Sequence, residues 1–451
     1  MLVLIRLYPK GSLSNMCKLV ESEKRNLYWD DVTPLYAIRQ EGKEYLSILL
    51  DVKNLEAIEK VFVKGLNAMA SVRETRTIPI MSPIYFPLPD KHPKDLARYL
   101  MYLRVEPGKY DKVYNKIKND LEASKNAFVV YLSYSFGDDD IIVTVLAEDR
   151  ETALNFGKDM IGKIDGVLAY DMSKVVERIS MIPEAKLKAH TDKFYYTVPA
   201  GQKGKMKNPE AYEKYLNERA PMNVIIRLFA KKNLAALWED IEKHIPKLES
   251  KNFTPLYASQ QETKDHITLI SEAINFEVLR DLLVKDLPKF VDVRKTRTIP
   301  MMDPTYYLLP KEHPKDLERF LISLKVNPGE ILDIESHITS LDFPKNVFMT
   351  YMTFTLGEDD ILVSILTDNQ KAAQKFAKDS FDKMIGVRSY EVSNQLKTKR
   401  LTTLKKWKQH QNRYLSSYDK QFSKDLDGSY DWTNDFDEYA TMTGAFPRDL
   451  E

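Results

Sequence analysis

Hydrophobic and polar residues alternate along the chain with two periods, one typical of strands and one typical of helices. LVLIRLYP, from Leu2, alternates as a strand, and a helical stretch follows at residues 15–25. PLYAIRQEGKEYLSILLDV predicts two strands around a turn at residues 41–43. LEAIEKVFVKGL predicts an amphipathic helix, and VRETRTIPI predicts a closing strand. The order of these elements is therefore βαββαβ.

The same order returns in the residues that follow. The segments are the strand RYLMYLRV, the helix KYDKVYNKIKNDL, the strands FVVYLSYSF and IIVTVLA around a GDDD turn, the helix ETALNFGKDMIGKI and the strand VLAYDMSKV. A βαββαβ unit forms a four-stranded antiparallel sheet with both helices on one face. Because the uncovered face must be buried, two such sheets are expected to face each other and form a barrel-like core.

The chain also repeats itself on a larger scale. RTIPIMSPIYFPLPDKHPKDL begins at Arg76, and RTIPMMDPTYYLLPKEHPKDL begins at Arg297. Further along, GDDD at Gly137 aligns with GEDD at Gly357. These repeats predict an α+β protein made of four ferredoxin-like units in two tandem pseudo-dimeric halves. The expected domains are residues 1–180, a linker at 181–220, residues 221–395 and a C-terminal tail at 396–451.

Composition narrows the function classes. The chain has 67 basic and 66 acidic residues, so no net field draws it to nucleic acid or membranes. Cys17 is its single cysteine, which excludes an intrachain disulfide and is typical of a reducing compartment. No apolar run approaches the roughly 20 residues of a membrane span. Glycine-rich phosphate loops are absent. We therefore expect a cytoplasmic protein without a cofactor.

The second unit of each half resembles a known ligand-binding domain. VEPGKYDKVYNKI and GDDDIIVTVLAEDRETALNFGKDMIGKIDGV, like VNPGEILDIESHI and GEDDILVSILTDNQKAAQKFAKDSFDKMIGV, resemble the effector-binding domain of the Lrp/AsnC regulators. The first units match in element order but lack the Gly-x-x-Asp turn. The helix-turn-helix that precedes this domain in those regulators has no counterpart ahead of the first strand. The resemblance implies a small effector, usually an amino acid, and assembly into a homo-oligomer, and it argues against direct operator binding.

The acidic turns are the expected effector site. Turn N–H groups would receive the carboxylate of a zwitterion and turn carboxylates its ammonium, with nearby arginines as further anion ligands. The candidate ligand-binding residues are Gly137, Asp138, Asp140, Gly357, Asp359, Asp360, Arg76 and Arg297. The alternative is structural, because Gly-Asp-Asp also forms hairpin turns and an arginine also bonds to carbonyls of a proline-rich segment.

Between the paired units, prolines at 79, 83, 87 and 89 predict an extended, polyproline-like strap rather than a central strand. His92 and His313 follow it and are expected to lie in turns. A metal or haem role is the alternative, since chlorite-dismutase-like haem proteins use a histidine. Neither histidine has a second histidine or a carboxylate three or four residues away on a regular element, so the metal site is not predicted.

The tail contains a predicted helix at 397–422 with Trp407 on its apolar stripe. The helix is expected to dock on the chain itself, with pairing to another subunit or weak nucleic-acid contact as alternatives. The basic residues for that contact would be Lys405, Lys406, Lys408 and Arg413. The acidic-aromatic segment after it is expected to dock on a partner.

These features lead to one principal hypothesis of function. The chain is expected to be a non-enzymatic, Lrp/AsnC-like regulatory protein that binds a small effector or a protein partner. One alternative is an α+β barrel enzyme, such as a haem-dependent or cofactor-free monooxygenase. The other alternative is an assembly scaffold.

Overall fold

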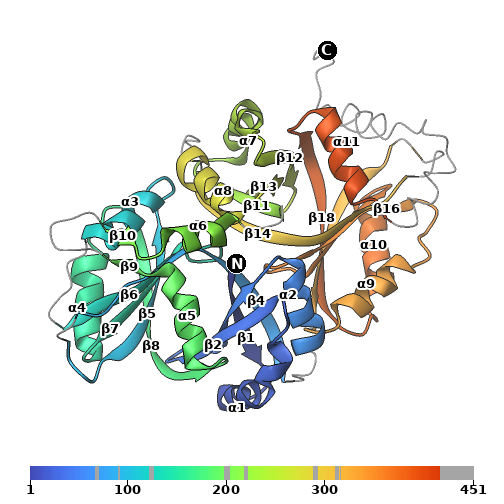
Figure 1. Cartoon of the computed structure of the whole chain (residues 1–451). Coiled ribbons are helices and arrows are strands. Elements are labelled where there is room, and N and C mark those ends of the chain that lie inside the picture. The colour runs from blue at the N-terminus through green and yellow to red at the C-terminus, as the bar shows by residue number, and fades with distance from the viewer. Residues whose placement is uncertain are drawn as a thin grey trace. The chain divides into compact units, whose positions relative to one another are not determined.

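The computed structural model describes residues 1–66, 71–89, 92–120, 126–197, 204–217, 222–287, 293–309, 314 and 316–416. The chain divides into two compact units (Figure 1). Unit 1 contains Met1–Ala220 together with Ile274–Lys289, and unit 2 contains Pro221–Ala273 and Phe290–Glu451. The short segment 274–289, which the sequence assigns to the second half, therefore packs within unit 1.

Each unit holds one closed barrel of antiparallel strands, so the fold is a mixed α/β fold with antiparallel sheets. The strands of unit 1, in the order β1-β3-β2-β8-β5-β7-β6-β4, are β1 Leu2–Pro9, β2 Val32–Gln40, β3 Leu46–Val52, β4 Val72–Tyr85, β5 Ala97–Val105, β6 Ala127–Ser135, β7 Ile141–Ala147 and β8 Val167–Ser180.

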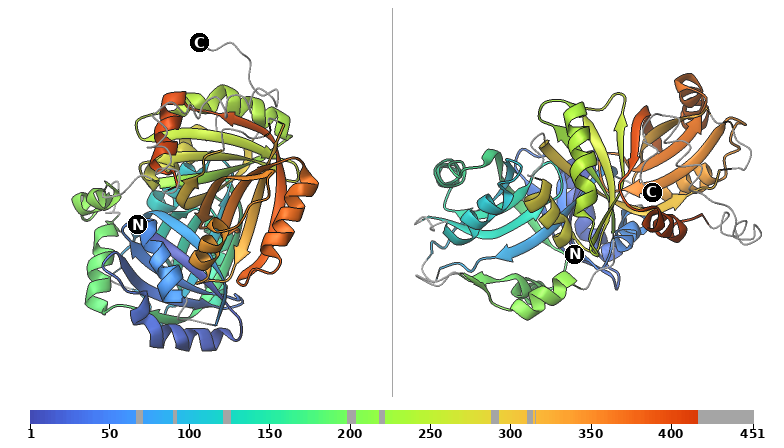
Figure 2. Two further views of the ribbon diagram at one scale, coloured as in Figure 1. Left: turned by 90° about the vertical axis from the view of Figure 1, so that its right-hand side faces the viewer. Right: turned by 90° about the horizontal axis from the view of Figure 1, so that it is seen from above.

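Unit 2 repeats this topology strand for strand, and Figure 2 shows its strands curving around a common interior. In the order β11-β13-β12-β18-β15-β17-β16-β14, its strands are β11 Met222–Ala230, β12 Phe253–Gln261, β13 His266–Ala273, β14 Val293–Tyr306, β15 Glu318–Val326, β16 Val347–Thr355, β17 Ile361–Thr367 and β18 Val387–Arg400.

The long strand β4 closes the barrel of unit 1, and this corrects the expected proline-rich strap. β4 pairs with β1 up to Ile80 and then with β6 from Ile80 to Tyr85. Pro79 lies within this strand, opposite Val3. The ladder breaks between Met81 and Ile84, where Ser82 has a φ of 44°. Such a bulge accommodates the proline at 83, because the chain there no longer needs a ladder N–H.

The helices of both units lie against the strands and are capped by side chains that the sequence supplies. Ser12, Asp149, Asn233, Asn275 and Asn369 each accept a backbone N–H of the first helical turn. These five residues cap α1 Leu13–Glu23, α4 Arg150–Phe156, α7 Leu234–His244, α8 Phe276–Asp281 and α10 Gln370–Phe381.

The other α-helices, of five to ten residues each, complete the two units. They are α2 Glu56–Lys60, α3 Tyr110–Asn115, α5 Glu184–Thr191, α6 Pro209–Asn217, α9 Ile331–Thr339 and α11 Leu404–Arg413, with a short β9 Tyr196–Thr197 and β10 Lys205–Met206 pair. No helix in the described part of the chain has the length and apolar character needed to span a bilayer.

The duplication extends past the ends that the sequence analysis assigns to it. Helix α5, in the expected linker, and helix α11, in the expected tail, occupy equivalent positions in the two units. After each helix the chain makes an equivalent parallel bridge, from Tyr85 to Tyr195 in unit 1 and from Tyr306 to Leu415 in unit 2. The expected helix at 397–422 is wrong at its start, because β18 continues to Arg400 and α11 begins at Leu404.

Candidate functional site

Each acidic turn forms a hydrogen bond to another strand of its own unit. A carboxylate oxygen of Asp140 accepts the backbone N–H of Val105 at 2.7 Å, and Asp360 accepts that of Val326 at the same distance. Gly137 and Gly357 precede these aspartates in the turns, and the Cβ of any other residue at Gly357 would lie 2.8 Å from Ile299. A structural role for the turns therefore has direct support in hydrogen bonds.

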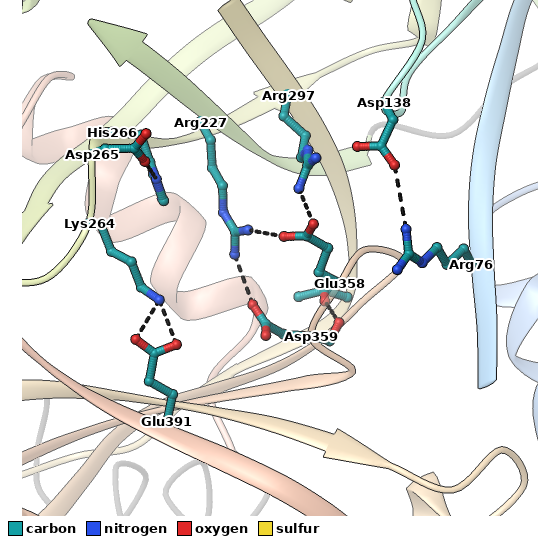
Figure 3. A network of polar contacts seen from close by, with 11 residues as sticks. Arg76, Asp138, Arg227, Lys264, Asp265, His266, Arg297, Glu358, Asp359 and Glu391 are labelled. Carbon is teal, nitrogen blue, oxygen red and sulfur yellow. Dashed lines mark hydrogen bonds and ion pairs between the residues drawn. The ribbon is translucent and has the colours of Figure 1, made fainter. Parts of the chain in front are cut away.

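Arginines on the adjacent strands bind the other turn carboxylates (Figure 3). In unit 2, Arg227 contacts Asp359 at 2.9 Å and Glu358 at 3.4 Å, and Arg297 pairs with Glu358. Arg227 and Arg297 are direct cross-strand partners on β11 and β14. Because two like charges in that position repel each other, the acidic turn stabilises the barrel end by neutralising them.

Unit 1 contains the same arrangement in a looser form. Arg6 and Arg76 lie opposite each other on β1 and β4. Arg6 contacts Asp139 and Arg76 contacts Asp138, each at 3.5 Å. The residues predicted to receive an effector are thus brought together by the fold, but the arginines already have carboxylate partners within the chain.

Of the two candidate metal ligands, the structure describes His92. Nδ1 of His92 lies 2.9 Å from the carbonyl oxygen of Pro89, and the His92 side chain is exposed. His313 lies outside the described residues. Across the described ranges, no group of three or more His, Cys, Asp or Glu side chains is arranged to hold a metal ion.

Replacing Asp360 with asparagine is expected to lower the free energy of unfolding by on the order of 2 kcal/mol. The substitution keeps the size of the side chain but removes the charge from a hydrogen bond to Val326 and from a contact to Arg388 at 3.5 Å. Urea unfolding measures the loss, and Asp342→Asn, at an exposed loop position, is the control. Unchanged stability together with lost amino-acid binding in calorimetry would instead favour an effector site at this turn.

The interior of unit 2 contains a cavity of about 120 Å³. Its wall is mainly aromatic and aliphatic, with hydroxyl groups and one guanidinium, that of Arg319. The Arg319 guanidinium donates to the hydroxyl of Thr350 at 3.1 Å and to that of Ser364 at 3.4 Å. Other lining residues include Tyr257, Tyr306, Tyr351, Leu362, Gln395 and Trp407. The cavity is therefore an apolar site with a few directed polar groups, which is typical of small-molecule sites.

Three polar side chains from the barrel wall and α11 form successive hydrogen bonds, and the last of them, Tyr306, lines this cavity. Nδ1 of His410 lies 2.8 Å from Glu272, and its Nε2 lies 3.0 Å from the hydroxyl of Tyr306. His410 is 1% exposed. Burial alone would raise the pKa of Glu272, but hydrogen bonds and charge from His410 and Arg413 outweigh it and hold that pKa below its usual value. Burial raises the pKa of Tyr306 well above that of a free tyrosine.

The lowered pKa of Glu272 indicates the direction of its hydrogen bond, in which the ionised carboxylate accepts the Nδ1–H of His410. In the tautomer of His410 that carries its proton on Nδ1 alone, Nε2 accepts the hydroxyl proton of Tyr306. The phenolic oxygen of Tyr306 is then an acceptor for a donor in the cavity. The chain Glu272–His410–Tyr306 is thus able to orient a bound hydroxyl group and to receive its proton.

Unit 1 keeps only part of this chain. His190, on α5, corresponds to His410, and its Nδ1 lies 3.3 Å from Asp51, which corresponds to Glu272. Within the described residues, Nε2 of His190 has no hydrogen-bond partner. Burial lowers the pKa of His190 to about 4, although the charge of Asp51 opposes the shift. The two units therefore share the histidine–carboxylate pair but differ at the cavity end.

Sequence reasoning missed both histidines. The available signal is the 220-residue shift, which places MIPEAKLKAH at 181 over LTTLKKWKQH at 401 and aligns the two histidines. The low identity of these segments hides the equivalence. Among the tail residues expected to contact nucleic acid, Lys406 pairs with Glu249 and Arg413 pairs with Glu272 at 2.7 Å, and both acids belong to unit 2.

Comparisons with known proteins do not identify a family. No protein-family model matches the sequence, and no curated protein matches it. Among solved structures, the chain is similar to a candidate monooxygenase from Fusobacterium nucleatum, with 12% identity, a TM-score of 0.27 and coverage of 40% of this chain and 93% of the other.

Two further structures give similar values. A candidate monooxygenase from Lactobacillus acidophilus has 14% identity, a TM-score of 0.26 and coverage of 41% and 95%. An anthrone oxidase-like protein has 10% identity, a TM-score of 0.28 and coverage of 41% and 94%. TM-scores this far below 0.5 establish neither a common fold nor a common activity.

Proposed function

We propose that this chain is a small-molecule-binding protein that takes its ligand inside the barrel of unit 2. The observation that carries the proposal is the contact of the Glu272–His410–Tyr306 chain with an otherwise mainly apolar cavity. Burying a carboxylate and an imidazole costs free energy unless they are hydrogen-bonded. Here two successive hydrogen bonds connect them to Tyr306 at the cavity wall. This arrangement favours ligands with a hydroxyl group.

The cavity size defines the ligand class further. An apolar cavity of about 150 Å³ in another protein accommodates benzene. The 120 Å³ of unit 2 therefore suits a single aromatic ring or a molecule of similar size. A monocyclic phenol combines that size with a donor for the Tyr306 oxygen. The same dimensions do not suit a haem, and Nε2 of His410 already contacts Tyr306.

The leading hypothesis is that the chain binds its ligand without catalysing a reaction. Each half-barrel has the strand order β4-β1-β3-β2 or its equivalent, which supports four ferredoxin-like units and is consistent with the Lrp/AsnC resemblance. In this view the effector lies within a barrel rather than at the acidic turns. A protein partner and a homo-oligomer remain parts of the same regulatory hypothesis.

We expect phenol to bind to the purified chain more tightly than toluene, and Tyr306→Phe to reduce that preference by about tenfold, the effect of losing one neutral hydrogen bond. His410→Gln should act in the same direction, because the tyrosine loses the group that orients it. Isothermal titration calorimetry measures both affinities. Tyr85→Phe, at the equivalent position of unit 1, is the matched control and should leave the preference unchanged. Equal binding of phenol and toluene to the unmodified chain would defeat the proposal.

Proton transfer is the second candidate function, and the same three residues favour it. A bound phenol would lose its hydroxyl proton through Tyr306 to Nε2 of His410, and Glu272 would stabilise the resulting imidazolium. 4-Nitrophenol reports this step, because its phenolate absorbs visible light. Conversion of bound 4-nitrophenol to the phenolate in the unmodified chain, but not in His410→Gln, would favour an enzyme over a sensor.

A further inference from the structure

The cavity of unit 1 differs from that of unit 2 in size and charge. Its volume is about 690 Å³, within the range of sites for drug-sized ligands. Two arginines line it, Arg98 on β5 and Arg178 on the adjacent strand β8. The rest of the wall is mainly aromatic and aliphatic and includes Tyr36, Tyr85, Tyr131, Leu4, Leu100 and Ile142.

In the part of the chain that the structure describes, these two arginines have no carboxylate partner. Within the described residues, neither Arg98 nor Arg178 forms an ion pair. Arg98 is partly buried, and burial together with the nearby charge of Arg178 lowers its pKa. Arg178 is exposed and lies over the ring of Tyr36, 5.1 Å from its centroid. Glu184 and Lys188 also line the cavity, and both are exposed, so their opposite charges lie at its solvent side.

In unit 2, the arginine at the position of Arg98 has hydrogen-bond partners on the cavity wall. Arg319 corresponds to Arg98, and it donates to the hydroxyls of Thr350 and Ser364. The residue that corresponds to Thr350 is Val130, which cannot accept a hydrogen bond through its side chain. Thr398 stands where unit 1 has Arg178. Unit 1 therefore has one more positive charge at its cavity and fewer wall hydroxyls to bind it.

We propose that the cavity of unit 1 binds an organic anion, a molecule with an aromatic or aliphatic body and a carboxylate, sulfonate or phosphate group held by Arg98 and Arg178. Guanidinium groups bind such oxyanions through paired hydrogen bonds, and an anion relieves the repulsion between two neighbouring cations. The apolar wall contacts the body of the ligand. This site is independent of the phenol site proposed for unit 2, so the two barrels bind different classes of molecule.

The test compares two fluorescent probes that differ by one anionic group. 8-Anilinonaphthalene-1-sulfonate has a naphthalene body with a sulfonate, and N-phenyl-1-naphthylamine has the same body without it. The full chain is expected to bind the sulfonate probe with one-to-one stoichiometry and at least tenfold more tightly than the neutral probe. Arg98→Met should remove most of this difference and change the affinity for the neutral probe less than twofold.

Two further variants make the result specific to the cavity. Arg178→Gln, at an exposed position, should weaken binding of the sulfonate probe without affecting folding. Arg104→Gln, an exposed arginine on the same strand as Arg98 that does not line the cavity, should leave both affinities unchanged. Equal affinity for the two probes, or sulfonate binding that neither Arg98→Met nor Arg178→Gln weakens, would overturn the proposal. Circular dichroism of each variant verifies that it is folded.

Discussion

Replacing Trp407 with alanine is expected to lower the free energy of unfolding by about 3–5 kcal/mol, the usual cost of removing a large buried aromatic side chain. Trp407 is 3% exposed and packs in a cluster with Leu256, Tyr257, Tyr306, Tyr351 and Leu415. The lost contacts would also weaken the packing of α11, and with it of His410, on the barrel. Urea unfolding followed by circular dichroism measures the change.

The same substitution should increase the size of the ligand that the cavity of unit 2 accepts. Trp407 lines the cavity of unit 2, so alanine enlarges it, and 2-naphthol is expected to bind to the variant when phenol alone fits the unmodified chain. Gln409→Ala, at an exposed position on the same helix, is the control and should leave both stability and ligand size unchanged. A stability loss below about 1 kcal/mol would show that α11 does not pack on unit 2 as described.

The stability of both units is expected to fall between neutral and mildly acidic pH because of two buried histidines. Burial lowers the pKa of His190 and of His266 to about 4 in the folded chain, and the charge of Arg227 adds to the effect at His266. In the unfolded chain both titrate near 6.5. Between these values the unfolded state binds the proton and the folded state does not, so stability rises with pH over this window.

The size of the effect follows from the two pKa values. Each histidine should remove about 2 kcal/mol of stability at pH 5 relative to pH 7, and roughly 3 kcal/mol once the pH is below 4. Urea unfolding at pH 7 and pH 5 measures it. His190→Gln and His266→Gln should each flatten the pH dependence, whereas Gln409→Ala, which removes no titratable group, should not. A pH dependence that is unchanged in both variants would show that groups other than these histidines cause it, and would contradict the prediction.

The chain's local patterns determined much of its architecture. Alternation and helical periodicity depend on neighbouring residues, so the strands, the helices and their order could be predicted from LVLIRLYP onward. The duplication of RTIP segments showed that two halves share one topology. The GDDD and GEDD turns were also placed correctly between strands, because glycine and aspartate favour turns wherever the chain folds.

Other features depend on contacts between distant residues, and only the tertiary structure decided them. Pro79 lies inside a strand because β4 pairs with β1 on one stretch and with β6 on the next, which no local rule encodes. His410 meets Glu272 across 138 residues and Tyr306 across 104. Its neighbours in sequence are polar, so its burial could not be predicted from them.

By itself, therefore, the sequence determined the repeated α and β elements and their pairing into two similar halves, since these follow from short-range periodicity and from comparison of one half with the other. The strand register within each barrel, the placement of residues 274–289 in unit 1 and the divergence of the two cavities were decided only in three dimensions. Arg98 and Arg319 occupy equivalent positions in the sequence, yet the hydroxyls around Arg319 and the second arginine beside Arg98 give them different surroundings. Such surroundings arise from strands that are far apart along the chain, which is why local patterns do not contain them.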